Sequence, residues 1–252
     1  RDKIKTQNID NLHVHTYHSM ACTFYDTSLQ NGEGYSQVLN SIIRGVCPLR
    51  RDFAYDIVVL DEVQDVTDQL FRLLIRMLHS FIKCPQLLII GDKNQCIYQF
   101  QGANPYFLTE SQTLFQSNHP ELREMEFIHR RLTTSYRITK PMADFVNHIV
   151  GYPRIRSIKK GTPTRVMVGN SFDLVDDILY LITSQIVKGT WHPDDIFILA
   201  PSVKKNSKER PLHILENMLV KNGIACFRPL SNEEKCHDPD IIKGKVVFST
   251  FH

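Results

Sequence analysis

Two short apolar runs constrain the fold of this chain more than any other feature of its sequence. Residues 57–60 and 87–90 have the length and branching of strands buried on both faces, and acidic residues follow each run at once. Between them, apolar residues recur at spacings of three and four from Leu70 to Ile82, which predicts an amphipathic helix capped by Thr67 or Asp68. Strand, helix and strand in this order predict a βαβ unit with parallel strands.

A second set of patterns follows the polar stretch at residues 116–120. The pattern predicts strands and helices in alternation, with the last helix ending near Asn222-Gly223. The predicted strands are residues 165–168, 196–199 and 245–248, and the predicted helices are residues 174–186 and 212–220. The sequence therefore predicts an α/β fold with two tandem domains, residues 1–120 and 121–252.

Bulk composition narrows the function only slightly. The formal net charge of +3 suits a nucleic-acid partner but is also common among proteins that bind none. The six cysteines form no CxxC pair, the start of the chain has no apolar secretory stretch, and no apolar run approaches the roughly 18 residues that span a bilayer. We therefore expect an intracellular protein, cytoplasmic or nuclear, that does not cross a membrane. Because the chain begins without Met and ends at a predicted strand-to-loop transition, we also expect an internal fragment.

The first predicted strand ends in an acidic loop, residues 61–65, with the sequence Asp-Glu-Val-Gln-Asp. In phosphoryl transfer a carboxylate at a strand end holds Mg²⁺, and a neighbouring carboxylate can deprotonate the attacking water. An isolated Asp-Glu pair is more often an acidic helix start. The five residues together resemble the Asp-Glu-x-Gln-Asp motif of UvrD/Rep-type superfamily 1 DNA helicases. This resemblance implies that Asp61 binds Mg²⁺, that Glu62 is the catalytic base, and that Gln64 links the nucleotide and DNA sites.

The loop after the second predicted strand, residues 91–103, is expected at the same sheet edge. An amide such as Gln95 can hydrogen-bond a γ-phosphate, and Tyr98 and Phe100 can stack on bases, although aromatic residues at alternating positions are more often core residues. The segment resembles helicase motif III. That resemblance implies that Asp92 lies at the nucleotide and that Gln95 senses the γ-phosphate, with Phe100 stacking on a base and Tyr98 beside it. Gln101 stands where the family usually has Arg, which removes a positive charge from the loop.

A further segment, Tyr136-Arg137, resembles helicase motif IV, although Ser135 and Ile138 depart from the family pattern. The resemblance implies that Arg137 is an arginine finger that stabilises charge on the γ-phosphate, with Tyr136 at the nucleotide. An ordinary surface arginine is the alternative for this position.

Both ends of the chain carry shorter resemblances. Thr16 and His18 match a Thr-x-His segment that UvrD-type helicases place against single-stranded DNA, and residues 249–252 resemble the opening of motif V, which implies that Thr250 and His252 contact nucleic acid. The histidines near position 15 also suggest zinc, but no cysteine pair completes such a site.

The resemblance as a whole implies two tandem RecA-like P-loop NTPase domains, the first incomplete at its N-terminus and the second at its C-terminus. No Gly-x-x-x-x-Gly-Lys-Ser/Thr occurs in the sequence, so the phosphate cradle is missing. We expect part of an ATP-dependent DNA helicase that uses ATP and Mg²⁺ and moves 3′ to 5′ on single-stranded or partly duplex DNA, inactive as this piece alone. One alternative is a catalytically inactive helicase scaffold that binds nucleic acid or regulates another protein. A second is an RNA-directed enzyme, which the DNA-type Asp-Glu-x-Gln-Asp motif disfavours.

Overall fold

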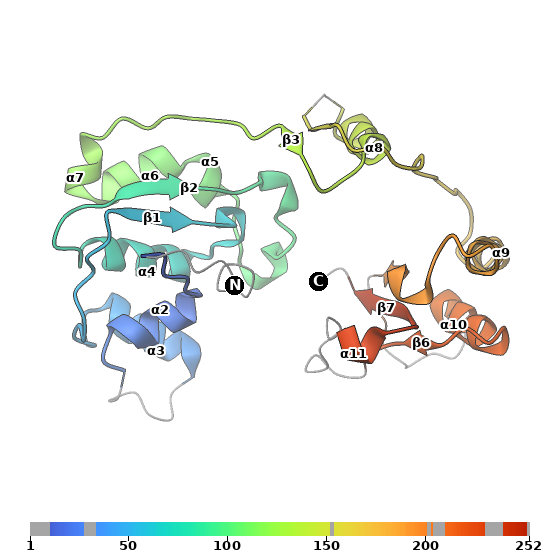
Figure 1. Cartoon of the computed structure of the whole chain (residues 1–252). Coiled ribbons are helices and arrows are strands. Elements are labelled where there is room, and N and C mark those ends of the chain that lie inside the picture. The colour runs from blue at the N-terminus through green and yellow to red at the C-terminus, as the bar shows by residue number, and fades with distance from the viewer. Residues whose placement is uncertain are drawn as a thin grey trace. The chain divides into compact units, whose positions relative to one another are not determined.

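The computed structural model describes residues 11–27, 34–151, 154–200, 203, 210–229 and 239–250. Contacts between residues divide the chain into two compact units, Arg1–His129 and Arg130–His252, and each unit is described by itself (Figure 1). This division falls beyond residue 120, where the sequence analysis divided the domains. The first unit extends further because Leu122, on α7 (Pro120–Arg123), is buried in its core. Within the described residues, no helix has both the length and the apolar character needed to cross a membrane.

The first unit is built on two parallel strands, β1 (Ile57–Leu60) and β2 (Gln86–Ile89), whose register pairs Ile57 with Gln86 and Leu60 with Ile89 (Figure 1). The helix between them, α4 (Asp68–Leu78), completes the predicted βαβ unit. Its N-cap is Thr67, whose hydroxyl accepts a hydrogen bond from Leu70 N at 3.3 Å. The local signals in the sequence therefore predicted this unit and its cap correctly.

Helix α4 ends earlier than its apolar pattern predicted. Backbone bonds from Ser80 N to Met77 O and from Phe81 N to Leu78 O turn the chain away from the helix axis. Phe81 then forms a parallel bridge with Phe53, and Ile82 is 75% exposed. The apolar periodicity continued past residue 78 because the partly buried Phe81 also packs against the core, although it does so from a β-bridge and not from the helix.

The prediction that both strands are buried on both faces was wrong. Ile57 and Val59 on β1 and Leu88 on β2 share one face of the sheet and are 50% to 58% exposed. The opposite face carries Leu60, which is only 6% exposed, and Leu87, which packs against the core. Among the described residues of this unit, the core covers one face of the sheet, and the face with Ile57, Val59 and Leu88 stays exposed.

Short helices complete the first unit and pack against the same core. An aromatic stack anchors α2, because Phe24 lies 4.2 Å from Phe53 and Phe53 lies 5.1 Å from Phe81, measured between ring centroids. The remaining elements are α2 (Tyr17–Phe24), α3 (Tyr35–Ile43), η2 (Val63–Asp65), η3 (Lys93–Gln95), η4 (Gln99–Gln101), α5 (Tyr106–Thr109) and α6 (Ser111–Asn118).

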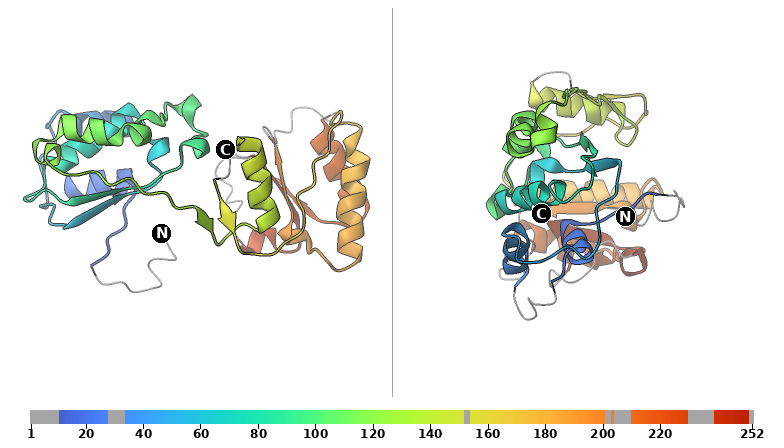
Figure 2. Two further views of the ribbon diagram at one scale, coloured as in Figure 1. Left: turned by 90° about the horizontal axis from the view of Figure 1, so that it is seen from above. Right: turned by 90° about the vertical axis from the view of Figure 1, so that its left-hand side faces the viewer.

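The second unit contains two small parallel sheets. One pairs two short strands, and the other has the strand order β5-β7-β6, with α9 and α10 packed against each other over its core (Figure 2). The elements are β3 (Thr134–Ser135), α8 (Lys140–Val150), β4 (Arg156–Ser157), α9 (Leu174–Val187), η5 (Pro193–Asp195), β5 (Phe197–Ala200), α10 (Pro211–Lys221), β6 (Cys226–Phe227), α11 (Pro239–Ile242) and β7 (Val246–Thr250).

Most of the elements predicted for the second unit are present. The helices over residues 174–186 and 212–220 correspond to α9 and α10, and α10 ends where Gly223 adopts a φ of +77°. The strand predicted at residues 165–168 was wrong, because this segment forms no strand and Val168 is 92% exposed. The α/β class is confirmed for the chain.

The N-cap of α4 allows a test of the prediction that the Thr67 side chain stabilises this helix. Replacing Thr67 with Ala is expected to lower the free energy of unfolding of the first unit by about 1 kcal/mol, because the hydroxyl no longer accepts the Leu70 N–H. Urea unfolding followed by hydrogen exchange at α4 amides measures this loss. Thr139→Ala is the matched control, because Thr139 caps α8 without a side-chain hydrogen bond. An equal loss in both variants would contradict the capping role of Thr67.

Candidate nucleotide-binding site at the strand ends

The loop that leaves β1 turns sharply at Glu62. This residue has φ +54° and ψ +42°, in the left-handed region that residues with a Cβ rarely adopt. The turn is held by Glu62 N, which donates to Asp61 Oδ1 at 3.0 Å, and by Asp65 N, which donates to Glu62 O at 3.0 Å. As a result the side chains of Asp61 and Glu62 are exposed at the strand end, while Val63 and Gln64 are buried.

Gln64 connects this loop to the loop that leaves β2. Its side chain is only 1% exposed. Its Nε2 donates to Glu62 Oε2 at 2.6 Å, and its Oε1 accepts from Asp92 N at 3.0 Å. The two strand-end loops are therefore joined by one carboxamide, at the sheet edge where the sequence predicted that they would meet.

In the loop that leaves β2, the carboxylate of Asp92 holds the side chain of Gln95. Asp92 Oδ1 accepts from Asn94 N at 3.1 Å, and Asp92 Oδ2 accepts from Gln95 Nε2 at 3.1 Å. Gln95 closes the short helix η3 and its side chain is exposed. The structure thus brings Asp92 and Gln95 together, and joins them to Glu62 through Gln64.

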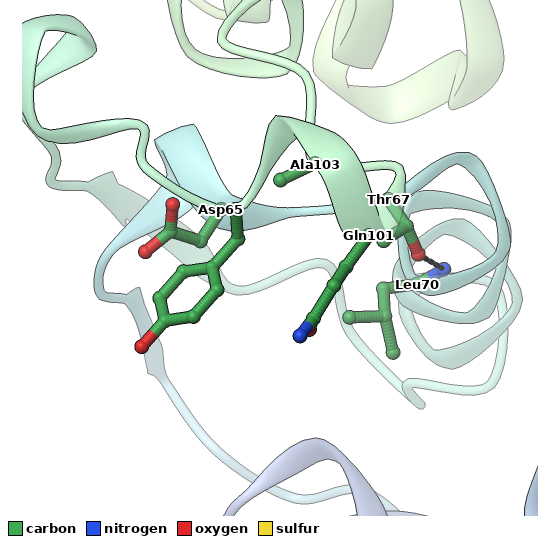
Figure 3. A pocket seen from close by; sticks show the side chains of 6 residues that line it. Asp65, Thr67, Leu70, Gln101 and Ala103 are labelled. Carbon is green, nitrogen blue, oxygen red and sulfur yellow. Dashed lines mark hydrogen bonds between the residues drawn. The ribbon is translucent and has the colours of Figure 1, made fainter. Parts of the chain in front are cut away.

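The two aromatic residues of this loop have different surroundings. Phe100 is 65% exposed, so the core alternative considered for it is wrong. The Tyr98 ring lies 6.3 Å from the Phe100 ring and lines a cavity of about 260 Å³ (Figure 3). The other residues lining this cavity are Asp65, Thr67, Leu70, Gln101 and Ala103. An exposed ring beside a half-buried one provides a surface on which a planar base can stack.

Asp65 belongs to the loop that leaves β1, and its surroundings disfavour the negative charge of its carboxylate. Burial raises the pKa of the Asp65 carboxyl above its ordinary value of 3.8, and the nearby Glu62 carboxylate raises it further. The Gln64 amide, 3.4 Å from Asp65 Oδ2, lowers the pKa in part. Asp65 Oδ1 is buried and has no hydrogen-bond partner among the residues that the structure describes.

Tyr17, on α2, is a neighbour of the site that the motifs did not indicate. Burial, together with the negative charge of Asp61 and the nearby Tyr35, raises the pKa of Tyr17 to about 12. The phenol therefore keeps its proton near neutral pH and can donate it in a hydrogen bond. The apolar spacing of Tyr17 with Met20, Ala21 and Phe24 is a helical pattern that could have placed α2 against the core.

The two residues on either side of Tyr17 have local partners. Thr16 Oγ1 accepts from Ser19 N at 3.1 Å, so it caps α2. The His18 ring lies edge-on to Tyr35 at 4.7 Å, and both Thr16 and His18 are exposed. Their proposed contact with DNA remains a prediction.

The donor set at the strand end fits a magnesium ion. Mg²⁺ is bound through one or two carboxylates together with phosphate oxygens and water, and Asp61 and Glu62 present carboxylates there. Within the described residues, no three side chains of the His, Cys, Asp or Glu types are placed to hold a metal by themselves. A metal at this site would therefore take its remaining ligands from the nucleotide and water.

In the second unit, the predicted residues lie at strand ends. Tyr136 is 78% exposed, and the exposed Arg137 follows β3, with its backbone N–H 3.3 Å from Ser135 Oγ. Thr250 is the last residue of β7 and pairs with Ala200. His252 lies outside the described residues.

Comparison with known proteins finds matches to the sequence of the first unit. Residues 47–116 match the family model of the UvrD/REP helicase N-terminal domain, a range that includes β1, α4, β2 and both loops. The F-box DNA helicase protein 1 of Schizosaccharomyces pombe is 30% identical over 96 residues, which are 38% of this chain and 9% of that protein. The ATP-dependent DNA helicase UvrD2 of Mycobacterium tuberculosis is 33% identical over 102 residues, 40% of this chain and 13% of that protein.

A third relative extends the similarity. The ATP-dependent DNA helicase Rep of Buchnera aphidicola is 28% identical over 170 residues, which are 66% of this chain and 24% of that protein. The α/β architecture and the match over residues 47–116 thus support a helicase-like P-loop fold. The resemblance to UvrD/Rep-type helicases is confirmed, and the chain spans about a tenth to a quarter of the length of these relatives.

The setting of Asp65 predicts a pH-dependent stability difference. Because its pKa is raised in the folded state, the charged carboxylate costs folding free energy at neutral pH, and the cost disappears as the pH falls through the folded pKa towards 3.8. Asp65→Asn is therefore expected to be more stable than the wild type at pH 7. The advantage should shrink on acidification and vanish below about pH 3.8. Thermal unfolding at several pH values measures this, and a constant difference across them would contradict the assignment.

Proposed function

We propose that this chain is part of the ATP-driven motor of a DNA helicase, with the ATP site at the ends of β1 and β2. The observation that supports this most is the single Gln64 carboxamide that joins the loop carrying Glu62 to the loop carrying Asp92 and Gln95. Relatives that are named as ATP-dependent DNA helicases resemble this chain in part of its length.

In this proposal the strand-end residues divide the work of ATP hydrolysis. Asp61 holds Mg²⁺, which offsets charge on the β- and γ-phosphates when it is bound. Glu62 accepts a proton from the attacking water, and Gln95 donates a hydrogen bond to the γ-phosphate from the position in which Asp92 holds it. Gln64 connects this site to the DNA-binding loop.

We also propose that single-stranded or partly duplex DNA lies along the aromatic side of the second loop, with movement from 3′ to 5′. Phe100 and Tyr98 provide stacking surfaces for bases. The remaining contacts are proposed for Thr16, His18, Thr250 and His252.

We propose two RecA-like domains, the first over residues 1–120 and the second over residues 121–252. The second domain is proposed to complete the motor. Arg137 would act as an arginine finger, because a planar guanidinium stabilises charge that develops on the γ-phosphate. Tyr136 would lie at the nucleotide. The exposure of both side chains supports these roles.

A non-catalytic helicase scaffold is the second candidate. One observation favours it: Gln101, which lines the cavity beside Tyr98, stands where the family usually has arginine. Such a protein would bind nucleic acid on the same loops without turnover.

An ATPase assay separates the two candidates. The 252-residue chain alone is expected to show no DNA-stimulated hydrolysis, because it lacks the backbone amides and lysine that hold phosphates. A longer protein with these residues and a phosphate-binding loop is expected to hydrolyse ATP. In that protein Glu62→Gln should lower kcat by roughly 100-fold or more and leave ATP binding intact, since the amide cannot accept the proton.

Two outcomes of the ATPase assay would each refute one part of the proposal. Robust turnover by the 252-residue chain would refute the proposed need for the missing loop. A longer protein that binds DNA but hydrolyses no ATP would support the scaffold and refute the motor.

The stacking surface predicts a specific loss of DNA affinity. Phe100→Ala is expected to weaken binding of single-stranded oligonucleotides by about tenfold, because loss of one base stack costs about 1–3 kcal/mol. Fluorescence anisotropy measures the affinity. Tyr106→Ala is the matched control, since Tyr106 is also an exposed aromatic residue of the first unit, 48% exposed on α5. Equal losses in the two variants would show that Phe100 has no specific role.

A further inference from the structure

Glu62 has a backbone conformation that is unfavourable by itself, so other contacts must hold its carboxylate in place. Its residue is in the left-handed region, where a Cβ crowds the following carbonyl and raises the free energy of the conformation. Such a conformation persists only where the surrounding structure holds it. The contacts around Glu62 therefore identify what holds its side chain.

Gln64 makes the side-chain contact that orients this carboxylate. The 2.6 Å bond from Gln64 Nε2 to Glu62 Oε2 fixes one oxygen of the carboxylate, and burial of Gln64 limits its own motion. The other end of the same carboxamide is fixed by Asp92 N. Because the amide group is planar, the bond from Asp92 N to its oxygen also helps to fix the direction of its nitrogen towards Glu62.

Gly91 provides the space for this arrangement. A Cβ at position 91 would lie 2.6 Å from Gln64 Oε1 and 2.9 Å from Leu108 Cδ2, so one of these atoms would have to move. The φ of Gly91 is not positive, so backbone conformation does not require glycine here. The requirement is the close approach of the Gln64 carboxamide to the chain at the end of β2.

We infer that Gln64 is a positioning residue for Glu62. The absence of a side chain at Gly91 lets the carboxamide of Gln64 reach Asp92 N in the loop after β2 while it holds the carboxylate of Glu62. The inference rests on the proposed role of Glu62 as the base. In this assignment Gln64 acts on the water through Glu62. It fixes the direction from which the exposed Glu62 carboxylate meets the water that it deprotonates.

The first test measures the contacts themselves in the 252-residue chain. Amide hydrogen exchange at Asp92 is expected to be at least about tenfold faster in Gln64→Met, which offers no acceptor, and in Gly91→Ala, which displaces the acceptor. In Gln64→Glu an ionised carboxylate cannot donate to Glu62 and repels it, although one of its oxygens can still accept from Asp92 N–H. Gln69→Met is the matched control, since Gln69 bonds only to α3 residues Ser36 and Asn40 among the contacts described for it.

The second test measures ATP hydrolysis in the longer protein that carries the phosphate-binding loop. Gln64→Met, Gln64→Glu and Gly91→Ala are each expected to lower kcat by at least about tenfold while the KM for ATP stays unchanged, and Gln69→Met should leave both constants unchanged. A purely structural role would instead lower the amount of folded enzyme and leave kcat per folded molecule unaltered. If Gln64→Glu retains wild-type kcat, the positioning role is wrong.

Failure of the proposed function gives a different result. If the longer wild-type protein has no ATPase, the motor is refuted, while slow exchange at Asp92 in the wild type and fast exchange in Gln64→Met would still support the link between the loops. If Asp92 exchanges equally fast in all variants, the link itself is refuted, whatever the ATPase shows.

Discussion

Backbone pairing between β1 and β2 is the interaction on which the rest of the first unit depends. Beyond the strands it continues through Ile90 N to Leu60 O at 2.8 Å and Val63 N to Ile90 O at 3.1 Å. These two bonds start both loops at the same level of the sheet edge. Only from there can the carboxamide of Gln64, which is a few ångströms long, span from Glu62 to Asp92. A shift of one residue in register would move these groups out of reach.

The sequence correctly predicted those parts of the fold that depend on residues close together along the chain. β1 coincides with its apolar run, and Thr67 caps α4, because strand burial and N-capping act over a few positions. The errors come from distant partners. Phe81 leaves the helical pattern to bridge to Phe53, and residues 165–168 have strand-like composition but pair with no strand in the part of the chain that the structure describes. No local pattern contains that information.

The site divides in the same way. Strand ends could be located from the sequence, so the exposed carboxylates of Asp61 and Glu62 were expected where they lie. The buried position of Gln64 could not be predicted, because it follows from the left-handed turn at Glu62 and from the missing side chain of Gly91. Nor could the nearness of Tyr17 to Asp61, which depends on how α2 packs against the aromatic stack around Phe24.

The open face of the first sheet has a consequence for the behaviour of the chain in solution. Val59 and Leu88 are paired neighbours, and with Ile57 they present adjoining apolar side chains to water. Contiguous apolar surface on a short parallel sheet promotes self-association as protein concentration rises. The exposed face of this short sheet is therefore the part of the first unit from which self-association would begin.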